Sequence, residues 1–462
     1  MTYLSIVKNI LKKFFFNLCR NKIILKLVCN FYVPINVYKN ISSFFINNSE
    51  ISKANRILEI AFEDKRIYGF EDHLTSIYYL QGEYRKSIEL MKRSESFRYQ
   101  SLLRFVDVKP KFRIFTSKIF SPIGHIGLLD IYIKASILGK FGDVGLTLLG
   151  PLDRYSNTSL IEYWSKYLDI IDKPESLGLQ PDLIETIEER ISLIRSKVEL
   201  FTLAEFGAEV QQEWEKKGFD GLLSLSQDHI EEGQKALESL GMPKDSWFCG
   251  IHVREGSERL TDARNASIDS YYLAIDEIIS RGGWVIRMGD KSMIKLPYKY
   301  GVIDLPFTEF NLDWMNLFVW SQGRFLIGTG SGPVVLPLCF GKGVAIANWA
   351  PLASRQWGSK DILLPKHYYH IRENRYLCPE ERMSEKYGYI ESKTALRNMG
   401  IEVHDNSPDE IKELIIQMIN SLTDSVKISE HQSRIQDRFD ILAYALRIYP
   451  SKIAHVFSNK YI

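Results

Sequence analysis

The sequence predicts an α/β protein in which two Rossmann-like domains face a cleft and follow an N-terminal helical extension. Short apolar segments alternate with helical segments in two separate regions of the chain, as in parallel-sheet domains. The 462 residues are too many for one ordinary core and suggest two or three domains. A composition of 45% hydrophobic and 25% charged residues is that of a globular protein without disordered or collagen-like bias.

The chain divides into predicted parts whose composition differs. These are a basic amphipathic segment at 1–48, helices at 49–108 that include a TPR-like hairpin, an N-terminal Rossmann-like domain at 109–240, a C-terminal Rossmann-like domain at 241–425, and C-terminal helices at 426–462. The alternative interpretation of 74–94, an ordinary helical hairpin, is favoured over a true repeat unit. The terminal helices could cross back to the first Rossmann-like domain.

Residues 1–49 contain no Asp or Glu, while lysines and arginines interrupt a background rich in Phe, Leu and Ile. Two interpretations remain open for this segment: it lies on an anionic membrane surface, or it packs on its own protein as a helical extension. The charges within 11–33 argue against a signal peptide and against a spanning helix. The protein is therefore expected in the cytoplasm, either free or peripheral at the inner face of the cytoplasmic membrane.

The five cysteines are odd in number, widely spaced and without a CxxC pair. This usage is typical of reduced thiols and gives no zinc framework. The formal net charge of +2 does not point to any partner, and a nucleic-acid partner is not expected.

The first Rossmann-like domain opens with a strand after Lys109, the loop Ser121–Gly127, a helix at about Leu128–Leu138 and a strand ending at Gly150. Helices are expected near 183–216 and 228–240. In the second domain, the strands are expected at Trp247–Val253, Trp284–Met288, Val302–Leu305, Arg324–Gly328 and Val344–Asn348, and the helices at Ile268–Arg281, Trp314–Gln322 and Val334–Phe340. Strands separated by single helices imply a parallel sheet with helices on both faces.

Ligands of open parallel sheets bind outside the carboxyl ends of the strands, so the loops after the strands are the candidate site. Three such loops in the second domain carry polar or glycine-rich sequence. His252, Arg254 and Glu255 stand at the end of the first strand, Arg287, Gly289 and Asp290 at the end of the second, and the run "IGTGSGP" with Gly328, Thr329, Gly330, Ser331 and Gly332 at the end of the fourth.

The glycines of "IGTGSGP" allow a close approach of backbone to a ligand, and the hydroxyls suit a phosphate. Tight strand-to-helix turns also use glycine for steric reasons alone, so this loop is weak evidence by itself. Arginines at two other strand ends favour the ligand, because guanidinium forks suit a diphosphate. The combination predicts a site for a nucleotide diphosphate.

Several side chains around this site have more than one interpretation. Arg264 and Asn265 could complete the donor site or belong to a solvated loop. Glu255 could orient Arg254 or bind a sugar hydroxyl, and Asp290 could accept from a ribose or sugar hydroxyl or cap the following helix.

The first domain offers candidates for a catalytic base. His125 stands between Gly124 and Gly127 at a strand end, where it could remove a proton from an acceptor hydroxyl or cap the following helix. Asp130, one turn on, could steady His125, act in its place, or only complement the helix dipole.

The segments "SPIGHIGLLDIYIKA", "GIHVRE", "GGWVIRMGD" and "FLIGTGSGPVVLPLCFGKGVAIAN" together resemble a family of bacterial glycosyltransferases from surface-polysaccharide gene clusters. More distantly, "HVR" and the glycine loop resemble fucosyltransferases with a His-x-Arg motif and heptosyltransferases, both of the GT-B fold. Heptosyltransferases carry an acidic residue and a histidine around their glycine loop, where this chain has Gly330 and Val335. The resemblance covers roughly residues 110–375.

The resemblance implies an inverting, metal-independent transfer from a nucleotide diphosphate sugar, without a cofactor, to a cell-surface glycan or lipid-linked acceptor. It implies that Arg254 holds the donor diphosphate, with Thr329 and Ser331 near the phosphates. Arg287 or Arg264 would support Arg254, and His125, Asp130 or Glu255 would be the base. Two other functions stay open: transfer of a non-sugar group to a surface glycan, and a non-catalytic helical-repeat or nucleotide-binding scaffold.

Overall fold

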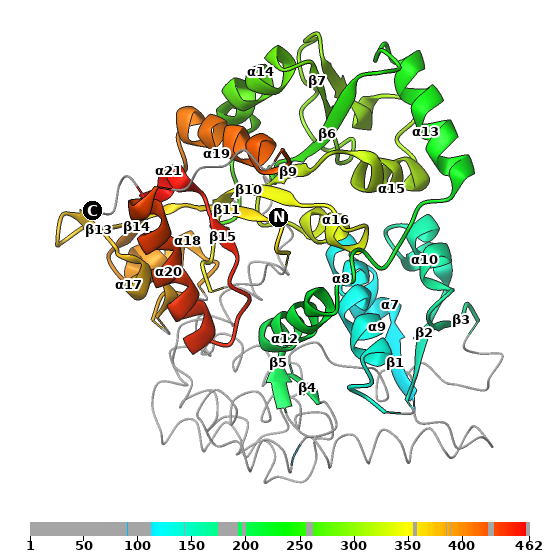
Figure 1. Ribbon diagram of the computed structural model, residues 1–462, viewed down its shortest axis with the longest axis horizontal. Coiled ribbons are helices and arrows are strands. Elements are labelled where there is room, and N and C mark those ends of the chain that lie inside the picture. Colours follow the sequence, from blue (N-terminus) through cyan, green and yellow to red (C-terminus); the bar gives the residue numbers. More distant parts are fainter. Residues whose placement is uncertain are drawn as a thin grey trace, which may run out of the picture. The chain divides into compact units, whose positions relative to one another are not determined.

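The computed structural model of the chain describes Leu90 and residues 112–142, 144–173, 193–195, 200–255, 262–353, 358–384, 386–388, 390–423 and 429–458 (Figure 1). The basic segment at 1–48 and the TPR-like hairpin lie outside these residues, so both stay predictions. Residues 108–184 and 194–462 form one compact unit, and the fold below belongs to it. Within the described residues, no helix is both long and apolar enough to cross a membrane.

The first α/β region is built on a small parallel sheet. Its strands are β1 (Phe112–Thr116), β2 (Gly145–Leu149) and β3 (Asp169–Ile171), in the order β1-β2-β3. Between β1 and β2 the chain forms α7 (Ser117–Phe120), α8 (Ile123–Gly127) and α9 (Leu129–Ile137), and α10 (Thr158–Trp164) precedes β3. The predicted strand–helix–strand opening is confirmed, except that the expected loop at 121–127 contains the short helix α8.

The core of this region is aromatic. Phe115 of β1 makes edge-on contacts with Phe120 and Tyr132, whose ring centroids both lie 4.9 Å away. Helix α12 (Leu203–Lys216) covers α9, and its Phe206 reaches Tyr132 at 6.3 Å. A capping box between Thr202 and Glu205 starts α12. Of the helix predicted near 183–216, the part at 203–216 is confirmed, whereas the described residues 193–195 and 200–202 form short strands. Residues 183–192 lie outside the described residues.

The second α/β region contains a seven-stranded sheet in which every pair of neighbouring strands is parallel. In spatial order the strands are β15 (Lys452–Ile453), β11 (Ile362–Pro365), β10 (Val344–Trp349), β9 (Leu326–Gly328), β6 (Trp247–His252), β7 (Gly283–Arg287) and β8 (Val302–Asp304). All five strands predicted for this domain are present, and β7 and β10 are buried along their whole length.

Helical segments follow β6, β8 and β9, as the sequence predicts, whereas β7 and β8 are joined by a loop; a further helix at 408–421 was not predicted. The helical segments are η3 (Ile268–Tyr271) followed by α14 (Tyr272–Ser280), η4 (Leu305–Phe307) followed by α15 (Asp313–Gln322), η5 (Gly332–Val335) followed by α16 (Leu336–Cys339), and α19 (Pro408–Ser421). Helix α13 (Gln227–Ser239) precedes β6 and matches the helix expected at 228–240.

A small antiparallel sheet departs from the predicted pattern. Strand β12 (His367–His370) pairs with both β13 (Arg375–Tyr376) and β14 (Ile401–His404), and α17 (Pro379–Met383) and α18 (Lys393–Asn398) lie between the last two strands in sequence. Its apolar side chains share a core with Ala263 and Ala350, which flank the predicted site. The small antiparallel sheet therefore packs against the loops at the carboxyl ends of β6 and β10.

The C-terminal segment was predicted as helices alone, and that prediction is wrong in one element. After α20 (Glu430–Ala445), residues 452–453 form β15 at the edge of the large sheet, and α21 (His455–Ser458) follows. Between α20 and β15 the chain touches the first α/β region: Tyr449 donates a hydrogen bond to Glu215 of α12. The guanidinium of Arg447 also lies 5.1 Å from the Phe201 ring.

Candidate functional site

The order of strands in the large sheet reverses between β6 and β9. From β6 the chain proceeds outward to β7 and β8, whereas from β9 it proceeds to the other side through β10 and β11. Open parallel sheets bind their ligands at such a switch point, outside the carboxyl ends of the two strands that diverge. His252 at the end of β6 pairs in register with Gly328 at the end of β9. The predicted donor loops therefore flank the switch point.

Hydrogen bonds tie the two loops together. Nδ1 of His252 lies 3.0 Å from Oγ of Ser331, and the backbone N–H of Arg254 donates to Oγ1 of the buried Thr329 at 3.0 Å. Burial lowers the pKa of His252 to about 4. His252 is consequently neutral at physiological pH and contributes a hydrogen bond, not a charge, to this site.

The arginines of the first loop are organised by Asp262, which the sequence analysis did not single out. Oδ2 of Asp262 lies 3.0 Å from Nη2 of Arg254 and 2.7 Å from Nη2 of Arg264. Oδ1 of Asp262 accepts from Nε of Arg264 at 2.9 Å, and Oδ1 of Asn265 accepts from Nε of Arg254 at 3.1 Å. We call Arg254, Asp262, Arg264 and Asn265 the arginine cluster.

One carboxylate in the arginine cluster serves two guanidinium groups. Burial by itself raises the pKa of Asp262, but the hydrogen bonds from Arg264 and the charges of both arginines hold that pKa below its ordinary value. A second carboxylate, Glu391, lies 3.4 Å from Arg264, although half of its side chain is exposed to water. Arg254 and Arg264 together outweigh the single charge of Asp262, and the half-exposed Glu391 offsets the remainder only through a water-screened contact; the side chains of Arg254 and Arg264 are 22% and 23% exposed.

Lys366 binds the backbone of the arginine cluster at Asn265. Its ammonium group is buried and donates to the backbone carbonyl of Asn265 at 2.6 Å and to Oδ1 of Asp405. Burial lowers the pKa of Lys366 to about 8, with Asp405 opposing that shift. Lys366 thus fixes the segment that carries Asn265, although nothing in its local sequence pattern marked it for this role.

The glycine loop lies directly against the arginine cluster. A Cβ atom added to Gly330 would lie 3.5 Å from Cγ of Arg264 and 3.4 Å from the carbonyl oxygen of Ala350, which are ordinary contact distances. By contrast, a Cβ on Gly328 would meet Val334 at 2.6 Å, and one on Gly332 would meet the backbone nitrogen of Gly124 at 2.8 Å. Internal packing therefore explains Gly328 and Gly332, but it does not explain Gly330.

The contact between Gly332 and Gly124 joins the two α/β regions. Helix α8, which carries Gly124 and His125, packs on η5 of the glycine loop. Nδ1 of the half-buried His125 lies within hydrogen-bonding distance of the carbonyl oxygen of Ile119. Because a carbonyl only accepts, Nδ1 carries the proton, and in the neutral ring Nε2 is then an acceptor. This arrangement suits a base.

Asp130 lies in the interior of the first α/β region. It is buried and forms an ion pair with Lys134, whose Nζ is 2.6 Å from Oδ2. Lys134 also donates to Gln211 of α12 at 3.0 Å, and burial raises the pKa of Asp130. The structure therefore places Asp130 between α9 and α12, and it gives no support to the expectation that Asp130 acts on an acceptor.

Arg287 also has a structural place. Its side chain is only 1% exposed, and its guanidinium lies 3.0 Å from Oε2 of Glu255 and 3.1 Å from Oδ1 of Asp304. The other oxygen of Glu255 accepts from the backbone N–H of Ile268. Glu255 thus orients Arg287 and not Arg254, and the expectation that Arg287 binds a diphosphate gains no support from this geometry.

The remaining predicted residues, Gly289 and Asp290, shape the turn after β7. Gly289 has φ 145°, and an added Cβ would lie 2.2 Å from the sulfur of Met293. Oδ1 of Asp290 accepts from the backbone N–H of Ser292 at 2.8 Å, a hydrogen bond that lowers the pKa of Asp290. Asp290 therefore caps a turn.

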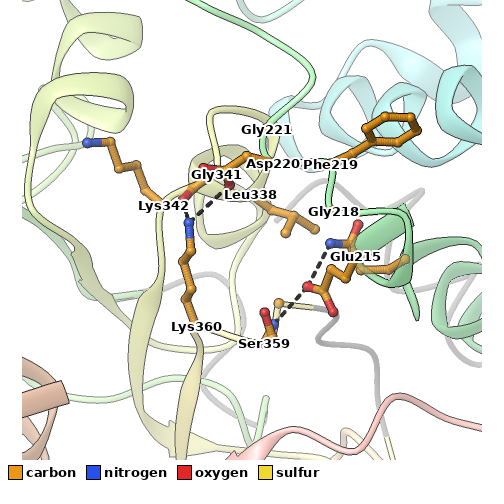
Figure 2. A pocket seen from close by; sticks show the side chains of 12 residues that line it. Glu215, Gly218, Phe219, Asp220, Gly221, Leu338, Gly341, Lys342, Ser359 and Lys360 are labelled. Carbon is orange, nitrogen blue, oxygen red and sulfur yellow. Dashed lines mark hydrogen bonds and ion pairs between the residues drawn. The ribbon is translucent and has the colours of Figure 1, made fainter. Parts of the chain in front are cut away.

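A cavity of about 330 Å³ lies elsewhere, at the amino ends of β10 and β11 (Figure 2). Lys360 donates to Oδ1 of Asp220 at 3.0 Å and to the carbonyl of Gly341 at 2.7 Å, and the N–H of Ser359 donates to Glu215 at 3.1 Å. The polar groups of Lys360, Asp220, Ser359 and Glu215 are therefore hydrogen-bonded to one another or to the backbone. The cavity is at the opposite end of the strands from the arginine cluster, so it is a separate feature.

Comparison with known proteins gives little guidance. No protein-family model and no curated protein matches the chain. Among solved structures, it is similar to a glycosyl transferase family 9 protein from Veillonella parvula DSM 2008, with 10% identity, a TM-score of 0.40, and coverage of 67% of this chain and 98% of that one. It is also similar to the dodecameric iron-containing heptosyltransferase TibC in complex with ADP-D-beta-D-heptose, with 11% identity, a TM-score of 0.34, and coverage of 67% and 76%. At these TM-scores the likeness decides neither the fold family nor the substrate.

Proposed function

We propose that the protein is a GT-B glycosyltransferase that moves a sugar from a nucleotide diphosphate sugar to a cell-surface glycan or lipid-linked acceptor, with inversion and without a metal ion. The observation that carries the proposal is the arginine cluster beside the glycine loop, where Arg254 and Arg264 share the carboxylate of Asp262 at the switch point of the sheet. The sugar and the acceptor class rest on the sequence resemblance.

The charge of the cluster suits a diphosphate. Two guanidinium groups share one buried carboxylate, and Glu391, the other carboxylate beside Arg264, is half exposed to water and can turn away from a ligand. Both arginine side chains retain exposed surface through which a ligand can reach them. Guanidinium forks bind phosphate oxygens in pairs, with planar geometry that a lysine lacks. As the bond between sugar and phosphate breaks, negative charge develops on the diphosphate, and Arg254 and Arg264 stabilise it.

Gly330 gives the phosphates room. Packing accepts a Cβ atom at this position but does not require its absence, so glycine leaves the volume of a single methyl group beside Arg264, into which a phosphate oxygen can reach. In the tautomer of neutral His252 that carries its proton on Nδ1, the ring donates to Oγ of Ser331, and the hydroxyl proton of Ser331 is then available to a phosphate oxygen. His252, Thr329 and Gly328 hold the loop in this position.

His125 is the base in this proposal. The acceptor hydroxyl attacks the anomeric carbon from the face opposite the diphosphate, Nε2 of His125 takes its proton, and the diphosphate leaves with the bonding electrons. The hydrogen bond at Nδ1 favours the tautomer that this step needs, and Gly124, the preceding residue, touches the glycine loop. Asp130 and Glu255 are each engaged in ion pairs, which makes them weaker candidates.

We also propose a role for the basic segment at 1–48, which is to bind the protein to the membrane. Its lysines and arginines would hold the protein on an anionic inner leaflet and bring a lipid-linked acceptor within reach. Deleting residues 1–48 should weaken the binding of the protein to anionic liposomes, and unchanged binding by the shortened chain would rule out this role.

Product mass tests the reaction. The full chain is incubated in EDTA with each of several nucleotide diphosphate sugars and with lipid-linked and free glycans, and the acceptor is analysed by mass spectrometry. We expect a gain of one sugar residue, lost in Arg254→Gln and His125→Gln but retained in Arg281→Gln, which alters a surface arginine on the same domain. A gain of phosphate or pyruvate mass would indicate transfer of a non-sugar group, and activity that requires added metal would refute metal independence.

A further inference from the structure

The loop between β7 and β8 exposes large apolar and aromatic side chains. Ile294 is 84% exposed, Tyr298 is 92% exposed and Tyr300 is 65% exposed. A single exposed apolar residue needs no explanation on a soluble protein, but several in one loop indicate an interaction surface. The donor site does not use these side chains.

The rest of the protein holds this loop in place. The carbonyl of Ile294 accepts from Nη1 of the buried Arg287 at 2.8 Å, and the N–H of Leu296 donates to Oδ2 of Asp304 at 2.8 Å. Both anchoring side chains lie at the carboxyl ends of their strands. Ile294 is therefore presented at the same edge of the sheet as the arginine cluster, which follows the neighbouring strand β6.

The charges on the loop are mainly positive. Lys291, Lys295 and Lys299 accompany one acidic residue, Asp290, whose carboxylate already caps the turn at Ser292. Lys299 pairs with Asp276 at 2.6 Å. Among the described residues, neither Lys291 nor Lys295 forms an ion pair; Nζ of Lys295 lies 5.9 Å from the centre of the Phe307 ring, a contact that leaves its charge unneutralised.

We propose that the loop of residues 289–301 docks on an anionic phospholipid bilayer. Ile294 enters the interface between headgroups and acyl chains, Tyr298 lies at headgroup level, and Lys291 and Lys295 approach lipid phosphates. Apolar, tyrosine and lysine side chains that alternate along one loop fit a lipid surface, because all three find their preferred environment within a few ångströms of depth. The surface is independent of the reaction and of residues 1–48.

Vesicle sedimentation of the full chain tests the surface. The vesicles are an equimolar mixture of phosphatidylglycerol and phosphatidylcholine, or phosphatidylcholine alone. The loop variant Ile294→Ser/Tyr298→Ser should bind the anionic vesicles about tenfold more weakly than the wild type. The control Ile441→Ser/Tyr444→Ser, which changes residues 68% and 62% exposed on α20, should bind as the wild type does. Equal binding of the loop variant and the wild type would overturn the proposal.

Hydrogen exchange locates the contact even if residues 1–48 add their own affinity. In the wild type, anionic vesicles should slow amide exchange in the peptide that spans 291–300, with little change on α20. Lys291→Gln/Lys295→Gln should lose much of this protection, and so should the wild type in concentrated salt. Unchanged exchange in 291–300 on vesicle-bound protein, or equal protection by phosphatidylcholine alone, would contradict docking on an anionic bilayer.

Discussion

Nη2 of Arg254 lies 3.0 Å from Oδ2 of Asp262, an oxygen that also binds Arg264. This shared carboxylate fixes both guanidinium groups beside the glycine loop.

Removal of this carboxylate by Asp262→Asn should lower the free energy of unfolding by about 1–2 kcal/mol. The loss is smaller than for a fully buried pair because both arginines can regain water. Urea denaturation measures the change. The control Asp276→Asn, which breaks an exposed pair with Lys299, should cost less than about 0.5 kcal/mol; equal costs would show that Asp262 is not structurally distinct.

Arg287 should matter for stability more than for ligand binding. Arg287→Met leaves the carboxylates of Glu255 and Asp304 without their buried partner, and we expect a loss of about 3–5 kcal/mol in the free energy of unfolding. The matched Arg281→Met, at an exposed pair with Glu277, should lose less than about 1 kcal/mol. If Arg287→Met kept its stability but lost nucleotide affinity, Arg287 would belong to the donor site after all.

His252 predicts a specific dependence of stability on pH. The pKa of His252 is about 4 in the folded protein and 6.5 for an ordinary histidine, as in the unfolded chain. Between pH 4 and 6.5 the unfolded chain is therefore protonated at this residue while the folded protein is not. The free energy of unfolding should therefore fall as the pH drops from 6.5 toward 4, by on the order of 2 kcal/mol from this residue. Urea denaturation of wild type and His252→Asn across this range isolates the contribution. Parallel curves would contradict a buried neutral imidazole.

The two classes of glycine in the loop can be separated by substitution. Gly332→Ala forces a Cβ toward the nitrogen of Gly124, so it should destabilise the fold by about 1–3 kcal/mol. Gly330→Ala meets ordinary contacts and should change the free energy of unfolding by less than about 0.5 kcal/mol, while it weakens nucleotide binding because it occupies the space left for phosphate. Calorimetric titration of the folded variant checks this, and full affinity in Gly330→Ala would remove the loop from the site.

The sequence predicts the large sheet well because its strands are buried on both faces. Such strands, for example β10, are continuous apolar runs bounded by glycine and polar residues, and this signal is local. Strand β12 carries histidine at both ends, and β15 has only two residues, so neither has the length or pattern of an internal strand. Their pairing depends on tertiary neighbours that local sequence does not reveal.

For the candidate site, the sequence locates the strand ends but not the partner of each charge. Arg254 and Arg287 both follow apolar strands and look equivalent in the sequence. Only the fold distinguishes them, because Asp304 and Glu255 enclose Arg287, while Arg254 keeps exposed surface. Asp262 carries one usable signal, its position two residues before Arg264, but its contact with Arg254 depends on how the loop returns.

The most direct test of the donor site is a thermal-shift panel of GDP, UDP, ADP, CMP and TDP on the wild type, Arg254→Ala, Arg264→Ala and the surface control Arg281→Ala. A ligand at about 100 times its dissociation constant stabilises the folded state by about 2.7 kcal/mol. We expect one nucleoside diphosphate to raise the melting temperature of the wild type and of Arg281→Ala, and to have little effect on the two cluster variants. No shift with any nucleotide, or an equal shift in Arg254→Ala, would contradict a donor site at the arginine cluster and favour a non-catalytic scaffold.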